Sequence, residues 1–172
     1  ISEVKDGVVP QPYWPWKDVG STRHAKQELS QIMEADAGED LFITPKPVRL
    51  IKRVLQIGAG KDALVLDFFG GSGTTLHATY ALNSEDDGFR RCILVQLPEL
   101  LTDVSPRGYK TIADITRDRI KRAGQKVRNE KPLLQKDLGF RAFKLDTSNI
   151  RAWNPAVNDL KASLFDHLEH LQ

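Results

Sequence analysis

The chain has 172 residues with 40% hydrophobic content, which suits one domain with a real hydrophobic core. Its formal net charge of +2 excludes a protein that binds nucleic acid by overall charge, and its one cysteine, Cys92, excludes a disulfide framework within a single chain. It has no signal peptide and no apolar run of the roughly 18 residues that a membrane span needs, which predicts a cytoplasmic protein without membrane contact.

The first 40 residues are predicted to be an irregular segment that carries one short helix. Residues 1–20 are rich in proline and aromatic residues, as is typical of the cut end of a longer connection. The helical spacing of Ala25, Leu29 and Ile32 predicts a helix over residues 23–35. A polar loop then leads into the next part of the chain.

Two strands and two helices are predicted between residues 44 and 97. Thr44-Pro45-Lys46-Pro47 opens a helix, because proline is well placed in a first helical turn, and Gly58 is a plausible stop. An apolar run then predicts a first strand over 63–67. A helix over 74–83 and a second strand over 91–96 follow.

Three further elements are predicted in the last third of the chain. Ser105-Pro106 has the chemistry of a helix start, which predicts a long helix to about Val127. Residues 139–145 alternate well enough for a third strand. Leucines at spacings of three and four predict a last amphipathic helix within residues 151–172.

The most informative motif is an apolar strand that closes on an acid and is followed by clustered glycines. It reads Asp67, Phe68, Phe69, Gly70, Gly71, Ser72, Gly73, Thr74, Thr75. Glycines let the backbone turn sharply and approach a ligand closely. The following helix presents free N–H groups and a positive dipole end, which suit a phosphate or a carboxylate. The motif therefore predicts a nucleotide-type cofactor site at the carboxyl end of a strand.

Three other interpretations of the glycine motif differ in what they require of the sequence. A turn between strand and helix without any ligand remains open. A dinucleotide fingerprint also remains open, although no glycine stands three places after Gly73. A phosphate-binding loop is excluded, because Gly60 and Lys61 precede the strand and are followed by Asp62.

The order of three motifs resembles the amino-methylating DNA methyltransferases of the β arrangement, and most closely the modification subunit of type III restriction–modification systems. The motifs are Thr44-Pro45-Lys46-Pro47, the glycine motif at 67–75, and the second strand with its continuation over 93–99. Residues 108–120 and 139–145 also look like that family, so the resemblance covers roughly residues 15–155. The first motif, placed just before the glycine motif, is the most specific of the three.

The resemblance implies S-adenosylmethionine as cofactor, bound by the half-domain at residues 41–150. Asp67 and the loop residues Phe68, Phe69, Gly70, Gly71, Ser72 and Gly73 would hold its methionine part. Thr44 and Lys46 would approach its carboxylate, and either Gln96 or Glu99 would bind the ribose hydroxyls. The family usually has an acid where this chain has Gln96, which leaves the two ribose candidates open.

The catalytic motif of the family, Asp-Pro-Pro-Tyr or a close variant, is not found in the 172 residues. In the β arrangement this motif and the target-recognition region precede the Thr-Pro-Lys-Pro motif, and only 43 residues do so here. The resemblance thus implies the carboxyl-terminal part of a longer enzyme that methylates the N6 amino group of adenine in DNA. We expect this part to be inactive alone, since the target base must be flipped out and gripped by the absent motif.

The expected fold is α/β, with an incomplete Rossmann-like methyltransferase sheet of about three mainly parallel strands and flanking helices. Its first strand would lack a neighbour on one side, which predicts self-association or an edge masked by residues 1–40. DNA and possibly a restriction endonuclease subunit would be the partners of the full-length enzyme. The alternatives are a dinucleotide-binding oxidoreductase domain and a non-catalytic interaction module.

Two further features concern partners and metals. Residues 107–131 carry nine basic against three acidic residues, and both a phosphate-binding surface and a solvated helix face explain such a run. No metal site is expected, because His24, His167 and His170 have no cysteine or acid at metal-ligand spacing.

Overall fold

The computed structural model describes residues 11–36, 39, 41–42, 44–101, 107–133, 135–146, 159 and 161. The chain divides into two compact units, residues 1–140 and residues 141–172. All helices and strands with assigned bounds lie in the first unit. Among the described residues, no helix combines the length and the hydrophobicity that a membrane span requires.

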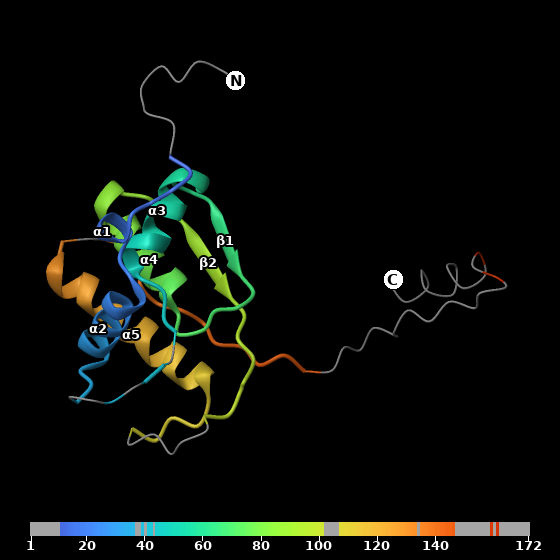
Figure 1. The fold of residues 1–172 in the computed structure, drawn as a ribbon. Coiled ribbons are helices and arrows are strands. Elements are labelled where there is room, and N and C mark those ends of the chain that lie inside the picture. Colours follow the sequence, from blue (N-terminus) through green and yellow to red (C-terminus); the bar gives the residue numbers. More distant parts are fainter. Residues whose placement is uncertain are drawn as a thin grey trace. The chain divides into compact units, whose positions relative to one another are not determined.

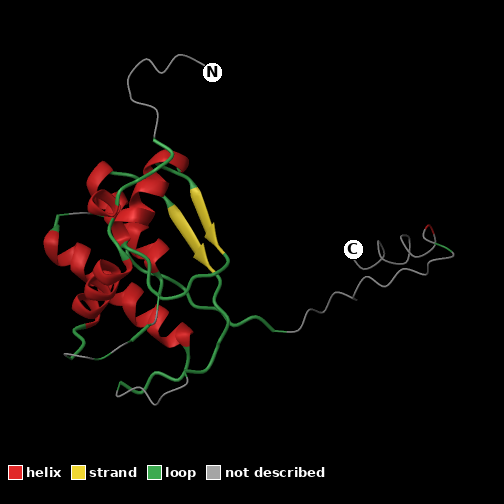
Figure 2. Ribbon diagram, viewed as in Figure 1, coloured by secondary structure: helices red, strands yellow, loops and turns green. Residues whose placement is uncertain are grey.

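The first unit contains five helices and two strands among its described residues (Figures 1 and 2). In chain order they are α1 (Trp16–Val19), α2 (Thr22–Met33), α3 (Val48–Gly58), β1 (Leu64–Asp67), α4 (Thr74–Asp86), β2 (Arg91–Leu94) and α5 (Ile112–Glu130). The helix predicted at 23–35, the strand predicted at 63–67 and the helix predicted at 74–83 agree with α2, β1 and α4 to within a few residues.

The strands β1 and β2 pair in parallel, with Leu64 opposite Arg91 and Asp67 opposite Leu94. Parallel neighbours need a crossover connection, and α4 supplies it. Both strands therefore end at the same edge of the sheet, where the glycine motif follows Asp67. This is the expected α/β arrangement of an incomplete Rossmann-like sheet, confirmed with two strands in the described residues.

One face of the sheet is packed and the other is open. Val65 on β1 packs with α3 and α4, while Cys92 and Leu94 on β2 pack against the cluster between α4 and α5. On the opposite face Leu64 is 55% exposed and Leu66 is 50% exposed, so their apolar side chains meet solvent. Parallel sheets are normally covered on both faces, which makes this open face unusual for a finished domain.

The core of the described residues consists of three hydrophobic clusters, each of which includes residues of α4, α5 or both. The first joins α4 and α5 to Leu138, the second joins α2 to α5, and the third joins α3 to α4. Tyr80 at the first cluster donates a hydrogen bond to the carbonyl of Gly139 over 2.8 Å. The helices thus surround the packed face of the sheet and fix the position of the glycine loop.

The long helix begins later than predicted. Residues 107–110 are not helical, and α5 starts at Ile112 with Thr111 as its N-cap. The Thr111 hydroxyl accepts from the N–H of Asp114, and the Asp114 carboxylate accepts from the N–H of Thr111 in return. This capping box satisfies two free N–H groups, which decides the start of the helix there. The predicted start at 105–106 lies outside the described residues.

The predicted third strand at 139–145 is wrong, because residues 139–146 form neither helix nor strand. Phe140, Phe143 and Leu145 are exposed there. Alternation of apolar residues makes a strand only where a neighbouring strand offers backbone partners, and no ladder involves these residues. The one-turn helix α1 was also not predicted, since residues 1–20 were expected to be irregular.

The predicted last helix falls outside the described residues, apart from Asp159 and Lys161. Residues 1–10 of the predicted irregular segment also lie outside them.

Candidate functional site

The candidate site lies where β1 and β2 end side by side. The loop 68–73 leaves Asp67 and enters α4 at Thr74. Its Gly70 N–H donates to the carbonyl of Val95 over 2.9 Å, and the Val95 N–H donates to the carbonyl of Asp67 over 2.8 Å. These bonds continue the pairing of the strands by one step and hold the loop beside the end of β2.

The Asp67 carboxylate shapes the loop that follows it. One oxygen accepts from the N–H of Phe69 at 3.0 Å, and the other accepts from the Thr75 hydroxyl at 2.6 Å. The carboxylate thereby ties the loop to the first turn of α4. A carboxylate has about four acceptor sites, so capacity remains for a ligand.

Two glycines of the loop are required by protein contacts. A Cβ on Gly70 would lie 3.3 Å from the Leu94 Cβ and 3.4 Å from the Val95 carbonyl oxygen. Gly73 has φ +80°, and a Cβ there would lie 3.2 Å from Thr116 in α5. The glycines therefore let the loop pack tightly between β2 and α5, in addition to the ligand approach predicted from the sequence.

Two side chains of α5 donate hydrogen bonds to the buried side of the loop and to the first residue of α4. Thr116 donates its hydroxyl hydrogen to the Gly71 carbonyl. The Arg119 guanidinium donates to the Ser72 hydroxyl at 2.7 Å and to the Thr74 hydroxyl at 2.8 Å. Sequence reasoning missed both residues. The available signal was an arginine on the apolar side of the helical repeat, between Thr116 and Ala123.

The segment that precedes α3 lies against the same loop. The Thr74 hydroxyl donates to the Lys46 carbonyl at 3.3 Å. Pro45 and Pro47 are buried, whereas Thr44 and Lys46 are exposed. The two motifs that the sequence predicted to form one site are therefore neighbours in the structure.

The helix α3 begins directly after this segment, and an acidic side chain of α2 lies at its N-terminus. The Val48 N–H donates to the Glu28 carboxylate of α2 at 2.9 Å. A carboxylate is favourable at this end of a helix, because it accepts from a free N–H and faces the positive dipole end. This contact fixes the segment relative to α2.

Of the two predicted ribose contacts, Gln96 is already engaged. Its Oε1 accepts from the Gly71 N–H at 2.7 Å, and its Nε2 donates to the Leu97 carbonyl at 3.1 Å. Glu99 is exposed, and no hydrogen bond or ion pair of its carboxylate is found with the described residues. The Gln96 amide thus holds the loop in place through the Gly71 N–H, whereas the Glu99 carboxylate is accessible to a ligand.

Two basic side chains, His77 of α4 and Arg119 of α5, are buried in the core. Burial first, and then the charges of Arg119 and Lys126, lower the pKa of His77 to about 3, so this imidazole is neutral at physiological pH. Burial lowers the pKa of Arg119 to about 10, which leaves its guanidinium charged. The inner side of the loop therefore faces one buried positive charge.

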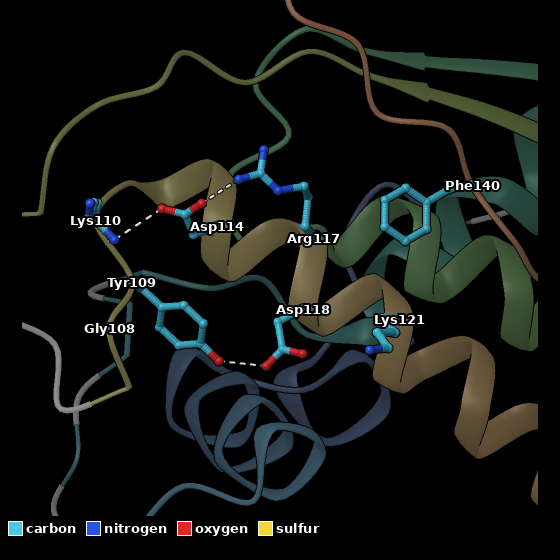
Figure 3. A pocket seen from close by; sticks show the side chains of 8 residues that line it. All are labelled: Gly108, Tyr109, Lys110, Asp114, Arg117, Asp118, Lys121 and Phe140. Carbon is cyan, nitrogen blue, oxygen red and sulfur yellow. Dashed lines mark hydrogen bonds and ion pairs between the residues drawn. The ribbon is translucent and has the colours of Figure 1, made fainter.

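Two hollows of about 520 Å³ each lie away from the glycine loop. Figure 3 shows the first, where Asp114, Arg117, Asp118 and Lys121 of α5 line the wall together with Phe140. Their charges nearly cancel, and Asp118 accepts from the Tyr109 hydroxyl. The second hollow lies between residues 11–19 and α3. None of the predicted cofactor residues lines either hollow.

The basic run at 107–131 is used largely within the protein. Six of its nine cationic side chains make ion pairs or hydrogen bonds to other described residues, namely Arg107, Arg117, Arg119, Arg122, Lys126 and Lys131. The structure thus favours the interpretation as a helix surface with internal pairing over a continuous phosphate-binding surface.

Comparison with known proteins places these motifs in a family. Residues 2–99 match the N6_N4_Mtase family model, described as DNA methylase. The chain is 40% identical over 135 residues to the StyLTI Mod subunit, a type III restriction–modification enzyme of Salmonella typhimurium, covering 77% of this chain and 20% of that protein. It is 41% identical over 120 residues to the EcoPI Mod subunit of Escherichia phage P1, covering 68% of this chain and 18% of that protein.

A similar match extends to a type II enzyme. The methyltransferase M.KpnI of Klebsiella pneumoniae is 38% identical over 109 residues, which is 61% of this chain and 25% of that protein. The chain thus spans about a quarter or less of the length of these curated relatives. Since the family model covers more than half of the chain, the protein belongs to the DNA methylase family.

Proposed function

We propose that this chain is the S-adenosylmethionine-binding part of a DNA methyltransferase of the type III restriction–modification kind, which methylates the N6 amino group of adenine. The observation that carries the proposal is the hydrogen bond from Thr74 to the Lys46 carbonyl, because it joins the two cofactor motifs at the carboxyl end of β1. Its similarity to Mod subunits supports the same activity.

The residues present fit such a cofactor. Lys46 and Thr44 are exposed beside the first turn of α4, where a cation, a hydroxyl and free N–H groups suit a carboxylate. Asp67 has acceptor capacity left for an ammonium group. Of the two candidate ribose contacts, Gln96 and Glu99, we propose Glu99, because the Gln96 amide is engaged with the loop. When bound, the cofactor supplies an activated methyl group on its sulfonium.

The proposed role of the remaining loop residues follows from their exposure. Phe68 and Phe69 are exposed at the open end of the loop, and Phe69 is 90% exposed. Apolar rings of this kind cover a bound ligand and exclude water from it. With Gly70, Gly71, Ser72 and Gly73, they would surround the methionine part of the cofactor.

The chain alone is proposed to be inactive. No Asp-Pro-Pro-Tyr motif occurs in its 172 residues, so the group that would grip the flipped adenine is missing from them. DNA and a restriction endonuclease subunit are proposed partners of the full-length enzyme, which we place in the cytoplasm. The Mod relatives, which bear the names of type III restriction–modification enzymes, support these partners.

Self-association of the isolated chain is proposed as well. Leu64, Leu66 and Ile93 expose about half of their surface on one face of the sheet, and Leu97, which follows β2 in the chain, is 66% exposed. Contiguous exposed apolar surface of this kind favours association in water. Sedimentation velocity over a concentration series tests this, and a monomer at all concentrations would contradict it.

Calorimetric titration of the 172-residue chain separates the candidate functions. We expect weak binding of S-adenosylmethionine and S-adenosylhomocysteine and no binding of NAD. Tight NAD binding would instead indicate a dinucleotide-binding oxidoreductase domain, and binding of no nucleotide would indicate an interaction module. A methylation assay on adenine-containing DNA should give no turnover with the chain alone.

A further inference from the structure

We propose that Arg119 is a positioning residue of the methyl-donor site, which holds the glycine loop and the Thr44–Pro47 segment together from the buried side. The inference rests on the proposed function, since it concerns the same site. It assigns a role to a side chain on α5, an element that the cofactor motifs do not include.

The burial of Arg119 is the first argument. Its side chain is 0% exposed, and no carboxylate among the described residues lies within ion-pair distance of it. Its Nε and Nη2 have no hydrogen-bond partner within the part of the chain that the structure describes. Burying a charge without a paired acid is costly, so hydrophobic packing alone does not account for an arginine here.

The contacts of its third nitrogen are the second argument. Nη1 donates to the Ser72 hydroxyl at 2.7 Å and to the Thr74 hydroxyl at 2.8 Å. A guanidinium can only donate, so the Thr74 oxygen accepts from it and turns its own hydrogen elsewhere. That hydrogen is donated to the Lys46 carbonyl at 3.3 Å. One relay thus joins α5, the loop and the Thr44–Pro47 segment.

The relay reaches both sides of the candidate site. Ser72 and Thr74 flank Gly73, whose positive φ brings the chain into α4. Lys46 carries one of the two exposed side chains proposed for the cofactor carboxylate. Displacement of a binding group by about 1 Å can cost a site about 100-fold in efficiency, so a fixed distance between the two motifs matters for function.

The test uses the 172-residue chain and four variants. Arg119→Lys keeps the charge but loses the planar guanidinium, and Arg119→Met removes both charge and donors at similar length. Thr74→Val keeps the shape and removes only the hydroxyl. Arg117→Met, on the exposed side of the same helix, is the matched control. Amide hydrogen exchange by mass spectrometry is measured without ligand, and S-adenosylhomocysteine affinity is measured by calorimetry.

We expect Arg119→Lys and Thr74→Val to raise exchange at residues 44–48 and 70–74 by about tenfold or more, with the other segments unchanged. Affinity for S-adenosylhomocysteine should fall by about tenfold or more in the same variants, and Arg117→Met should match the unmodified chain. Arg119→Lys and Thr74→Val each keep a side chain of similar size, so these two variants test the proposed role of Arg119 even if Arg119→Met fails to fold.

The proposal is overturned if Arg119→Lys exchanges like the unmodified chain, or if exchange rises equally in all segments, as it would for a merely structural residue. It is also overturned if Thr74→Val leaves residues 44–48 unchanged. Absence of nucleotide binding by the unmodified chain would contradict the proposed function instead, since the exchange measurement still decides whether Arg119 holds the two segments together.

Discussion

Because His77 is buried and neutral in the folded chain, the free energy of unfolding of the protein should depend on pH. The pKa of His77 is about 3 in the folded chain against an ordinary value of 6.5, and the first cause is burial. Between these two values the unfolded chain binds a proton that the folded chain does not bind. The free energy of unfolding therefore rises with pH in this window, and stability is lost as the pH falls below about 6.5.

The magnitude follows from the two pKa values. From about pH 8 to about pH 5, this one group should remove about 2 kcal/mol of unfolding free energy. A hydrogen bond from Arg90 keeps the pKa of Asp86 below 3.8. At Asp114 burial raises the pKa, but hydrogen bonds from Thr111 and Lys110 outweigh it and leave the pKa below 3.8. Both contributions to stability are lost only at lower pH. Among the described groups whose pKa is shifted, His77 is the one that titrates between about pH 5 and 6.5.

Urea denaturation at about pH 8, 6 and 5 measures the effect, with two histidine variants for comparison. His77→Asn removes the titrating group and should reduce the change to about 0.5 kcal/mol or less. His24→Asn, in α2, should keep the full change. If His77→Asn loses as much stability as the unmodified chain between about pH 8 and 5, the reasoning from burial is refuted.

Three further predictions concern the loop, the sheet and the cysteine. Gly73→Ala should lower the unfolding free energy by about 2–4 kcal/mol in urea denaturation, because φ is +80° and the new Cβ would crowd Thr116. Gly58→Ala is the control, since its Cβ would lie in open space, and it should be neutral or slightly stabilising. Leu66→Glu on the open face should weaken self-association in sedimentation velocity without loss of secondary structure in circular dichroism. Burial raises the pKa of the Cys92 thiol from 9.0 to about 11. At about pH 8 the thiol should therefore react with a thiol reagent roughly a hundredfold more slowly in the folded chain than in the chain unfolded by urea. Equal rates would show an accessible thiolate.

The sequence by itself determined the features that depend on neighbouring residues. The strand before Asp67, the helix after the glycines and the helix after Pro47 were predicted from periodicity and turn chemistry, because these act over one or two turns of chain. The order of the three motifs was likewise enough to indicate the DNA methylase family, which the family comparison confirmed.

The tertiary structure alone decided what the side chains near the site contact. Whether residues 139–145 form a strand depended on a partner edge, and whether Gln96 is available depended on its distance from the Gly71 N–H. Arg119 looked like one more charge on a basic helix, yet α5 packs it under the loop with 0% exposure. Periodicity indicates which face of a helix is apolar, but only packing between distant segments determines which polar group that face carries into the interior.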